Sequence, residues 1–153
     1  MTKTLKCLCV AVMVVALMVP GAAMAKTFKI GVSVIVSHPA LDADQKGFEQ
    51  ALKDNGLKAK YDYQNAQGDM SNAQAIARKF KGDNLDLVHS IATPTSQAMV
   101  KVVTRTPVVY SSVTDPVDAG LVKTMGPAGG NVTGVSDAWP YDRQVKLHHD
   151  MVP

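Results

Sequence analysis

Cysteine is almost absent from this 153-residue sequence. Its two cysteines, Cys7 and Cys9, both lie close to the N-terminus. The chain from Lys26 onward therefore has no disulfide, no thiol nucleophile and no thiolate metal site. A lipid-anchored protein would need a cysteine just after an N-terminal apolar run, and Cys7 and Cys9 come too early for that. We therefore expect no intrinsic membrane anchor in the mature chain.

Long apolar runs are also missing, except near the N-terminus. Lys3 and Lys6 precede an apolar run over residues 7–19, and Ala23-Met24-Ala25 forms a small-x-small cleavage site after it. The run is shorter than the roughly 20 residues that a membrane-spanning helix needs. The pattern predicts a signal peptide over residues 1–25, cleaved near Ala25, and hence a periplasmic protein.

The sequence has no strong excess of one charge and none of the common catalytic motifs. The formal net charge of +3 falls to about +1 without Lys3 and Lys6, and no basic stripe indicates a nucleic-acid partner. GxGxxG, Walker, GxSxG, HExxH and CxxC patterns are all missing. We therefore predict no cofactor, no metal site and no nucleic-acid partner.

From Lys26 onward, β-rich segments alternate with helical ones. This alternation predicts an α/β fold, an open parallel sheet with helices on both faces and a flavodoxin-like strand order of 2-1-3-4-5. We expect a lobe over residues 26–138, followed by a crossover helix over residues 139–153. The predicted strands span residues 28–36, 60–64, 85–91, 106–110 and 131–135, and the predicted helices begin at Pro39, Ser71, Thr93 and Tyr141.

Local signals suggest how some helices begin and which side they bury. Ser71 with Gln74 matches a capping box, and Thr93 is the expected N-cap of a helix with Pro94 at its first position. In the last helix the expected inward positions are Val145, Leu147, His148 and Met151.

Ligands of open α/β sheets bind beyond the carboxyl ends of the strands, where the strand order reverses. Hydroxyls and free N–H groups at the start of the third helix suit a carboxylate, although they could also serve only as caps. Asp115 could accept a hydrogen bond from a ligand ammonium or cap a turn, and Asp137 could face the ligand or solvent. The predicted ligand-binding residues are Ser37, His38, Thr93, Thr95, Ser96, Ser111, Ser112, Thr114, Asp115 and Asp137.

The histidines carry little sign of catalysis. His38 stands before a proline at a helix start, where a cap or a ligand contact is the more common role, and an enzyme would need it to act with Asp42 or Asp115. His148 and His149 point about 100° apart on a helix and cannot chelate one metal together. His89 lies inside a predicted strand and is expected in the core. We predict no catalytic residue.

Four segments together resemble a known family. The stretches VSHPALDADQKGF, SIATPTSQAMV, VTDPVDAGLV and GGNVTGVSD, in this order behind a signal peptide, resemble ABC-transporter substrate-binding proteins of the tryptophan/tyrosine-binding type. The resemblance implies a type I periplasmic-binding-protein fold, in which two lobes close on a small solute and deliver it to a membrane permease. Only the N-terminal lobe matches here, with no second lobe after residue 153.

The resemblance and the residues together favour the solute-binding component of an ABC importer, with an amino acid, aromatic ones included, as the expected solute. Two alternatives stay open. The chain could be the extracytoplasmic sensor domain of a signalling protein, or an exported α/β enzyme that uses His38.

Overall fold

The computed structural model describes residues 26–127 and 129–152. They form one sheet of five parallel strands in the order β2-β1-β3-β4-β5. The predicted α/β class and strand order are confirmed. The predicted signal peptide, residues 1–25, lies outside the described residues.

The elements follow one another as alternating strands and helices up to β4. In chain order they are β1 (Thr27–Val34), α2 (Pro39–Asp54), β2 (Lys58–Asn65), α3 (Met70–Gly82), β3 (Leu87–Ile91), α4 (Thr93–Val102), β4 (Val108–Val113), β5 (Val132–Ser136) and α5 (Tyr141–Met151).

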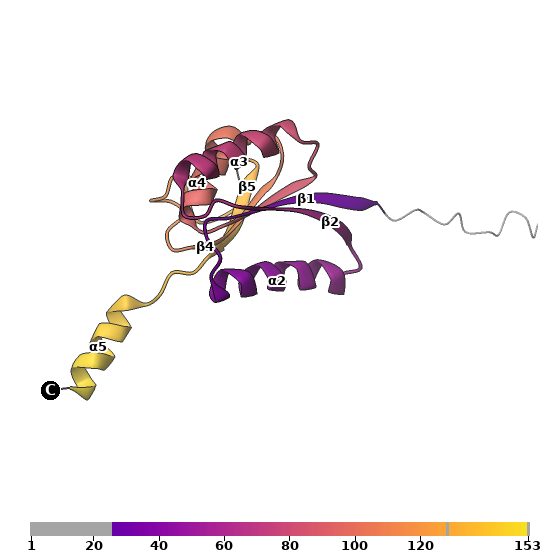
Figure 1. The fold of residues 1–153 in the computed structure, drawn as a ribbon. Coiled ribbons are helices and arrows are strands. Elements are labelled where there is room, and N and C mark those ends of the chain that lie inside the picture. The colour runs from indigo at the N-terminus through magenta and orange to yellow at the C-terminus, as the bar shows by residue number, and fades with distance from the viewer. Residues whose placement is uncertain (1–25, 128, 153) are drawn as a thin grey trace, which may run out of the picture.

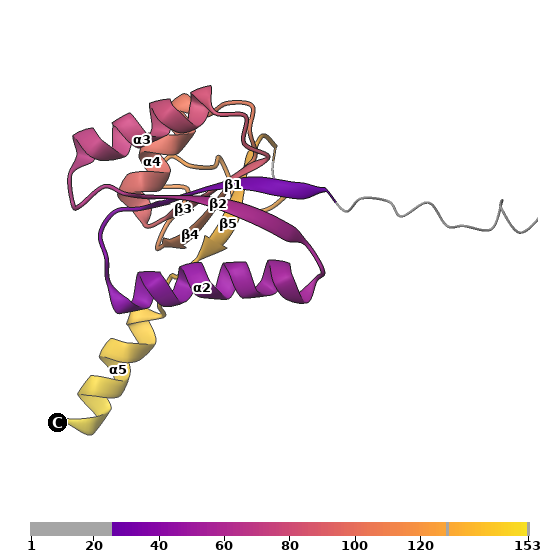
Figure 2. The same ribbon diagram turned by 45° about the vertical axis from the view of Figure 1, so that its right-hand side comes forward.

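Helices cover both faces of the sheet, as Figures 1 and 2 show: α3 and α4 lie on one face and α2 on the other. Because successive strand residues point to opposite faces, Val88 packs with Phe80 and Met99 under α3 and α4, while Ile91 packs toward Phe48 of α2. Phe80 is fully buried, and burying such a side chain stabilises the fold by about 1.5–3 kcal/mol.

Two helices begin differently from the prediction. The N-cap of α3 is Asp69, whose side chain accepts hydrogen bonds from the N–H groups of Ser71 (2.6 Å) and Asn72 (3.0 Å). The predicted capping box at Ser71 is therefore wrong, because the helix already begins at Met70. Thr93 is likewise the first helical residue of α4 and not its N-cap, since Ala92 holds that position without a side-chain hydrogen bond.

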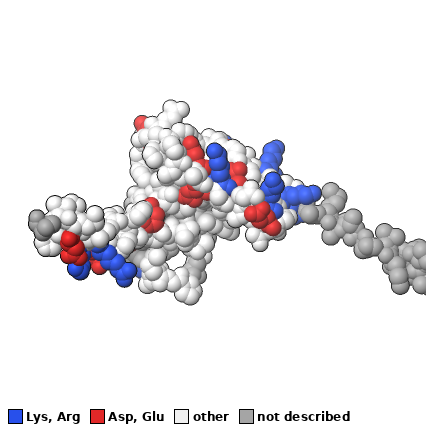
Figure 3. Space-filling model, turned by 90° about the horizontal axis from the view of Figure 1, so that it is seen from below, with Lys and Arg blue, Asp and Glu red and all other residues white. Residues whose placement is uncertain are grey.

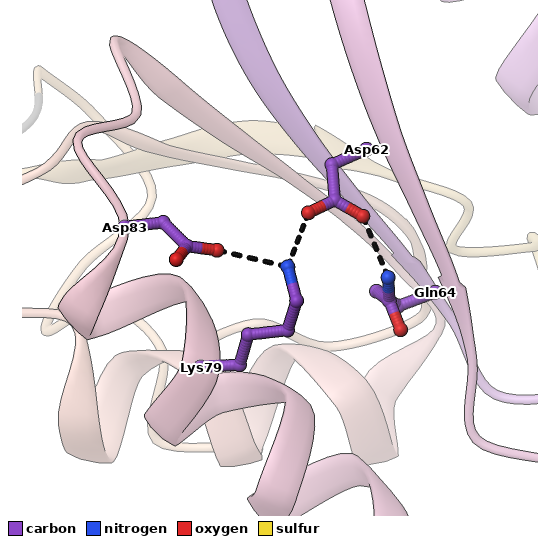
Figure 4. A network of polar contacts seen from close by, with 4 residues as sticks. All are labelled: Asp62, Gln64, Lys79 and Asp83. Atoms are coloured by element: carbon purple, nitrogen blue, oxygen red, sulfur yellow. Dashed lines mark hydrogen bonds and ion pairs between the residues drawn. The ribbon is translucent and has the colours of Figure 1, made fainter.

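A polar network fastens α3 to the edge strand β2 (Figure 4). The Lys79 ammonium contacts the carboxylates of Asp62 and Asp83, and Gln64 donates to Asp62 at 2.6 Å. Burial raises the pKa of Asp62, but the hydrogen bonds from Lys79 and Gln64 outweigh it and leave that pKa below its ordinary value. Charged side chains on an edge strand also hinder pairing with another sheet.

The last helix, α5, extends away from the lobe (Figures 1 and 2). Val145, Leu147 and Met151 are 70%, 59% and 71% exposed, and His148 is exposed as well. The predicted inward positions therefore contact no core, because no described element packs against this helix.

Charges of both signs are interspersed on the face that Figure 3 presents, including where the chain enters β1. Among the described residues, no helix combines the length and apolar character needed to cross a membrane.

Candidate functional site

The carboxyl ends of four strands line up at one edge of the sheet. Val34 of β1 pairs with Ile91 of β3, Ile91 pairs with Ser111 of β4, and Val113 pairs with Ser136 of β5. The predicted ligand-binding residues therefore converge on a single edge. We call this edge the rim and define it as residues 35–38, 92–96, 111–115 and 137.

At the first part of the rim, Ser37 and His38 are exposed between β1 and α2. His38 is the N-cap of α2, and its Nδ1 atom accepts a hydrogen bond from the N–H of Ala40 at 3.2 Å. The cap expected of a histidine in this position is confirmed. A capping contact of this kind orients the helix start and gives no support to the alternative of a catalytic His38.

The hydroxyls of Thr95 and Ser96 face inward. Both residues are fully buried. The Thr95 hydroxyl donates to the carbonyls of Ile91 (2.5 Å) and Ala92 (3.0 Å). The Ser96 hydroxyl donates to the Ala92 carbonyl at 2.9 Å and lies 2.8 Å from the hydroxyl of Ser90. These hydroxyls hold the turn between β3 and α4, and the ligand contact expected of the two side chains stays a prediction. Thr93 stays partly exposed at the start of α4.

The backbone is strained at this edge. The non-glycine residues with positive φ in the described chain are Gln67 (56°), Ala92 (80°) and Ser112 (53°). Gln67 follows β2, Ala92 follows β3, and Ser112 is the second-to-last residue of β4. All three are therefore near the carboxyl ends of strands. Such conformations are costly and gather at binding and catalytic sites, which marks the rim as the candidate functional edge.

β4 is longer than predicted and continues through Ser111 and Ser112 to Val113. These serines were expected in a loop beyond the strand, but the apolar Val113 completes the pattern and is fully buried. The Ser111 hydroxyl lies 2.8 Å from Nε2 of His89. The Ser112 hydroxyl donates to the carboxylate of Asp44 at 2.6 Å.

Asp44 and His89 contact the end of β4, and neither was among the predicted ligand-binding residues. Asp44 lies four residues before Phe48 and therefore on the same side of α2, the side that faces the sheet. This spacing was the one feature of the sequence that could have indicated an inward-facing Asp44. His89 is 1% exposed, which confirms its predicted place in the core. Burial lowers the pKa of His89 to about 4, against smaller opposing effects of Asp44 and Glu49.

Beyond β4, Asp115 accepts hydrogen bonds from the N–H groups of Val117 (2.9 Å) and Asp118 (3.0 Å), which confirms its turn-capping role. Thr114 is exposed, and its carbonyl accepts from the Ser136 hydroxyl at 2.7 Å. Asp137 is exposed and donates its N–H to the carbonyl of Val113 at 3.1 Å, which places this residue beside the end of β4.

The rim offers binding groups, and its described residues include no solvent-exposed serine paired with a histidine. At the start of α4, Pro94 has no N–H and the N–H of Ser96 bonds to the Ala92 carbonyl. The N–H groups of Thr93 and Thr95 are left without a partner within the helix, at the positive end of its dipole. The closest Ser–His contact, Ser111 with His89, is shut away from solvent at 6% and 1% exposure. Among the described residues, no group of three or more His, Cys, Asp or Glu side chains is placed to hold a metal ion.

Two cavities lie away from the rim. One of about 500 Å³ is lined by Lys29, Lys60 and Asp83 among others, and one of about 610 Å³ lies beside β5 along residues 121–127 and 129–134. Neither is lined by any predicted ligand-binding residue. The rim itself is open to solvent, since its exposed residues include Ser37, His38, Thr114, Asp115 and Asp137.

Comparison with known proteins agrees with this geometry. The family described as "ABC transporter substrate binding protein" matches residues 29–153. A curated relative, the "Tyrosine-binding protein" of Clostridioides difficile, is 45% identical over 132 residues, which make up 84% of this chain and 38% of the relative.

Solved structures are similar over the same part of the chain. A conserved domain protein from Vibrio cholerae is 45% identical with a TM-score of 0.80, covering 84% of this chain and 45% of its own. An ABC domain from Streptococcus pneumonia in complex with L-Trp is 41% identical with a TM-score of 0.76, covering 80% of this chain and 42% of its own. The present chain thus spans less than half the length of these relatives. With a match over most of its length, it belongs to the family of ABC transporter substrate-binding proteins.

Proposed function

We propose that this chain is the solute-binding component of an ABC importer and captures an amino acid, with aromatic ones favoured, at the rim. The observation that carries the proposal is the convergence of the ends of β1, β3 and β4 on one edge beside the start of α4. The relatives support the choice of solute, since one is named for tyrosine and another was solved with L-Trp.

The rim has matching groups for both ends of an amino acid. The N–H groups at the start of α4, beside Thr93, suit the carboxylate because the helix dipole favours an anion there. Asp137 and Asp115 are exposed, so their carboxylates can accept hydrogen bonds from the ammonium; Asp115 keeps acceptor capacity beyond its turn contacts. Ser37, His38 and Thr114 border the same space as further polar contacts.

A second surface has to cover the ligand, because good sites bury roughly 70–90% of a small molecule and the rim is open. We propose that a second lobe supplies it, reached through α5 acting as the crossover helix. Closure of two lobes about a hinge would trap the solute. In this proposal the protein is periplasmic after signal-peptide removal, and its partner is the membrane permease of the importer. Solute capture requires no chemical step, so we propose no catalytic role.

Titration calorimetry with L-tryptophan and L-tyrosine, on the protein that carries the proposed second lobe, tests the proposal. We expect saturable binding without turnover. Tryptamine, which lacks the carboxylate, should bind more weakly than L-tryptophan, because the start of α4 loses its anion. Indole-3-propionate, which lacks the ammonium, should be weakened in the same way.

A matched pair of variants locates the site. Asp137→Ala should weaken L-tryptophan binding, whereas Asp54→Ala, which removes the same charge at the far end of α2, should leave it unchanged. No measurable heat with either amino acid, or equal binding of all four compounds, would refute an amino-acid site at the rim.

A further inference from the structure

The end of β4 has an irregular backbone. The pairing of β4 with β5 shifts register between Tyr110 and Val113, and Ser112 has a φ of 53°. A non-glycine residue keeps such a conformation only when its surroundings hold it there. The segment that continues into Thr114 and Asp115 of the rim therefore depends on local restraints.

Two side-chain hydrogen bonds supply these restraints, one for each serine. The hydroxyl of Ser112 donates to Asp44 at 2.6 Å, although the two residues are 68 apart in the chain. The hydroxyl of Ser111 pairs with Nε2 of His89 at 2.8 Å, where both residues are buried. A hydrogen bond to a carboxylate is stronger than one between neutral groups, so the contact with Asp44 is the tighter restraint.

Both restraints are connected to α2. Asp44 is a residue of this helix, and the ring of His89 stacks on Phe48 with centroids 4.1 Å apart. The same helix begins at His38, which together with Ser37 forms the first part of the rim. A single rigid element thus joins the end of β1 to the end of β4.

The protonation of His89 follows from its surroundings. Its Nδ1 atom is buried and has no hydrogen-bond partner in the described structure. An unpaired N–H in that position would be costly, so we assign the proton to Nε2, which donates to Ser111. In this arrangement Nε2 of His89 donates a hydrogen bond to the hydroxyl of Ser111 in β4.

We propose that Asp44 and His89 are positioning residues for the ligand: they set the conformation of residues 111–115 without touching the solute. This inference rests on the proposed function and deepens it. It assigns to Asp44 and His89, which lie behind the exposed residues of the rim, the task of keeping Thr114 and Asp115 in place for binding.

The variants separate positioning from general stability. Asp44→Ala removes the acceptor of Ser112, Asp44→Asn keeps an oxygen that can accept from it, and Asp54→Ala is the charge control on the same helix. His89→Phe keeps a ring against Phe48 and removes only the polar contact with Ser111.

Two measurements are made on each variant. The first is the Kd for L-tryptophan and L-tyrosine by calorimetry, and the second is hydrogen–deuterium exchange of residues 108–118 without any ligand. Urea unfolding confirms that each variant is folded under the conditions used.

We expect Asp44→Ala to weaken binding roughly tenfold and His89→Phe roughly fivefold, in line with one charged and one neutral hydrogen bond lost. Exchange in residues 108–118 should become faster in both. Asp44→Asn should recover most of the affinity and protection, and Asp54→Ala should match the unmodified protein.

Unchanged affinity together with unchanged exchange in Asp44→Ala and His89→Phe would overturn the inference. Faster exchange of residues 108–118 with unchanged affinity would overturn it as well, because ligand binding would then not depend on the conformation of this segment. If the unmodified protein binds neither amino acid, the proposed function fails, and exchange alone decides whether the two residues hold residues 111–115.

Discussion

The pH dependence of stability gives a direct test of the buried histidine. The pKa of His89 is about 4 in the fold, against an ordinary value of 6.5, chiefly because burial disfavours its charged form. The unfolded chain therefore takes up a proton before the folded protein does. Stability from this group is complete above pH 6.5 and is lost as the pH falls toward 4.

The size of the loss follows from the shift. Each unit of difference between the folded and unfolded pKa is worth about 1.4 kcal/mol. The free energy of unfolding should therefore fall by about 3 kcal/mol between neutral pH and pH 4 because of His89. His89→Phe has no ionisable group at this position and should not show that part of the acid destabilisation. Acidic groups with lowered pKa values, such as Asp62 and Asp86, contribute equally to both proteins and cancel in the comparison.

The assay is urea unfolding, followed by circular dichroism, at several pH values between 7.5 and 4. We expect His89→Phe to gain about 3 kcal/mol relative to the unmodified protein over this range. His149→Phe, a change on the exposed side of α5, is the matched control and should run parallel to the unmodified protein. If the His89→Phe curve is also parallel, His89 is not held neutral by burial and the reasoning is refuted.

Three further changes test the packing and the backbone. Gly31→Ala should lower the free energy of unfolding by about 1–3 kcal/mol, because the added Cβ would lie 2.7 Å from a methyl group of Leu85; unchanged urea unfolding would contradict this. Asp69→Ala should lower the melting temperature, and Ser71→Ala should not, since only Asp69 caps α3; the reverse result would restore the capping box. Ala92→Gly should raise the free energy of unfolding by about 1 kcal/mol, because glycine tolerates the φ of 80° found there; a loss of stability in urea would show that the turn is unstrained.

Patterns of apolar residues were enough to predict the architecture. Most β-rich segments were separated from the next by a helical one, and the right-handed crossover of parallel strands then leaves few strand orders. The order β2-β1-β3-β4-β5 follows from these rules without any knowledge of individual contacts. The edge where the predicted ligand-binding residues gather followed in turn from the strand order.

Individual side-chain roles were harder to predict, because they change when a helix or strand begins or ends only a residue or a few away from the predicted position. Starting α3 at Met70 moved its cap from Ser71 to Asp69. Extending β4 to Val113 turned Ser111 inward, onto His89. A serine has the same sequence signature whether its hydroxyl meets solvent or a backbone carbonyl, so the burial of Ser96 could not be foreseen.

The position of Asp44 in the sequence carries part of the signal for its role. An acidic residue four positions before Phe48, on the side of α2 that faces the sheet, needs a partner inside the protein. The partner, Ser112, lies too far along the chain for any local pattern to identify it.

Binding of the solute at the rim can be seen residue by residue in amide chemical shifts, measured by NMR during titration with L-tryptophan. We expect the shift changes to concentrate in residues 36–38, 92–95, 111–115 and 137. Shifts confined to the opposite edge of the sheet, around residues 58–60 and 83–86, would contradict it.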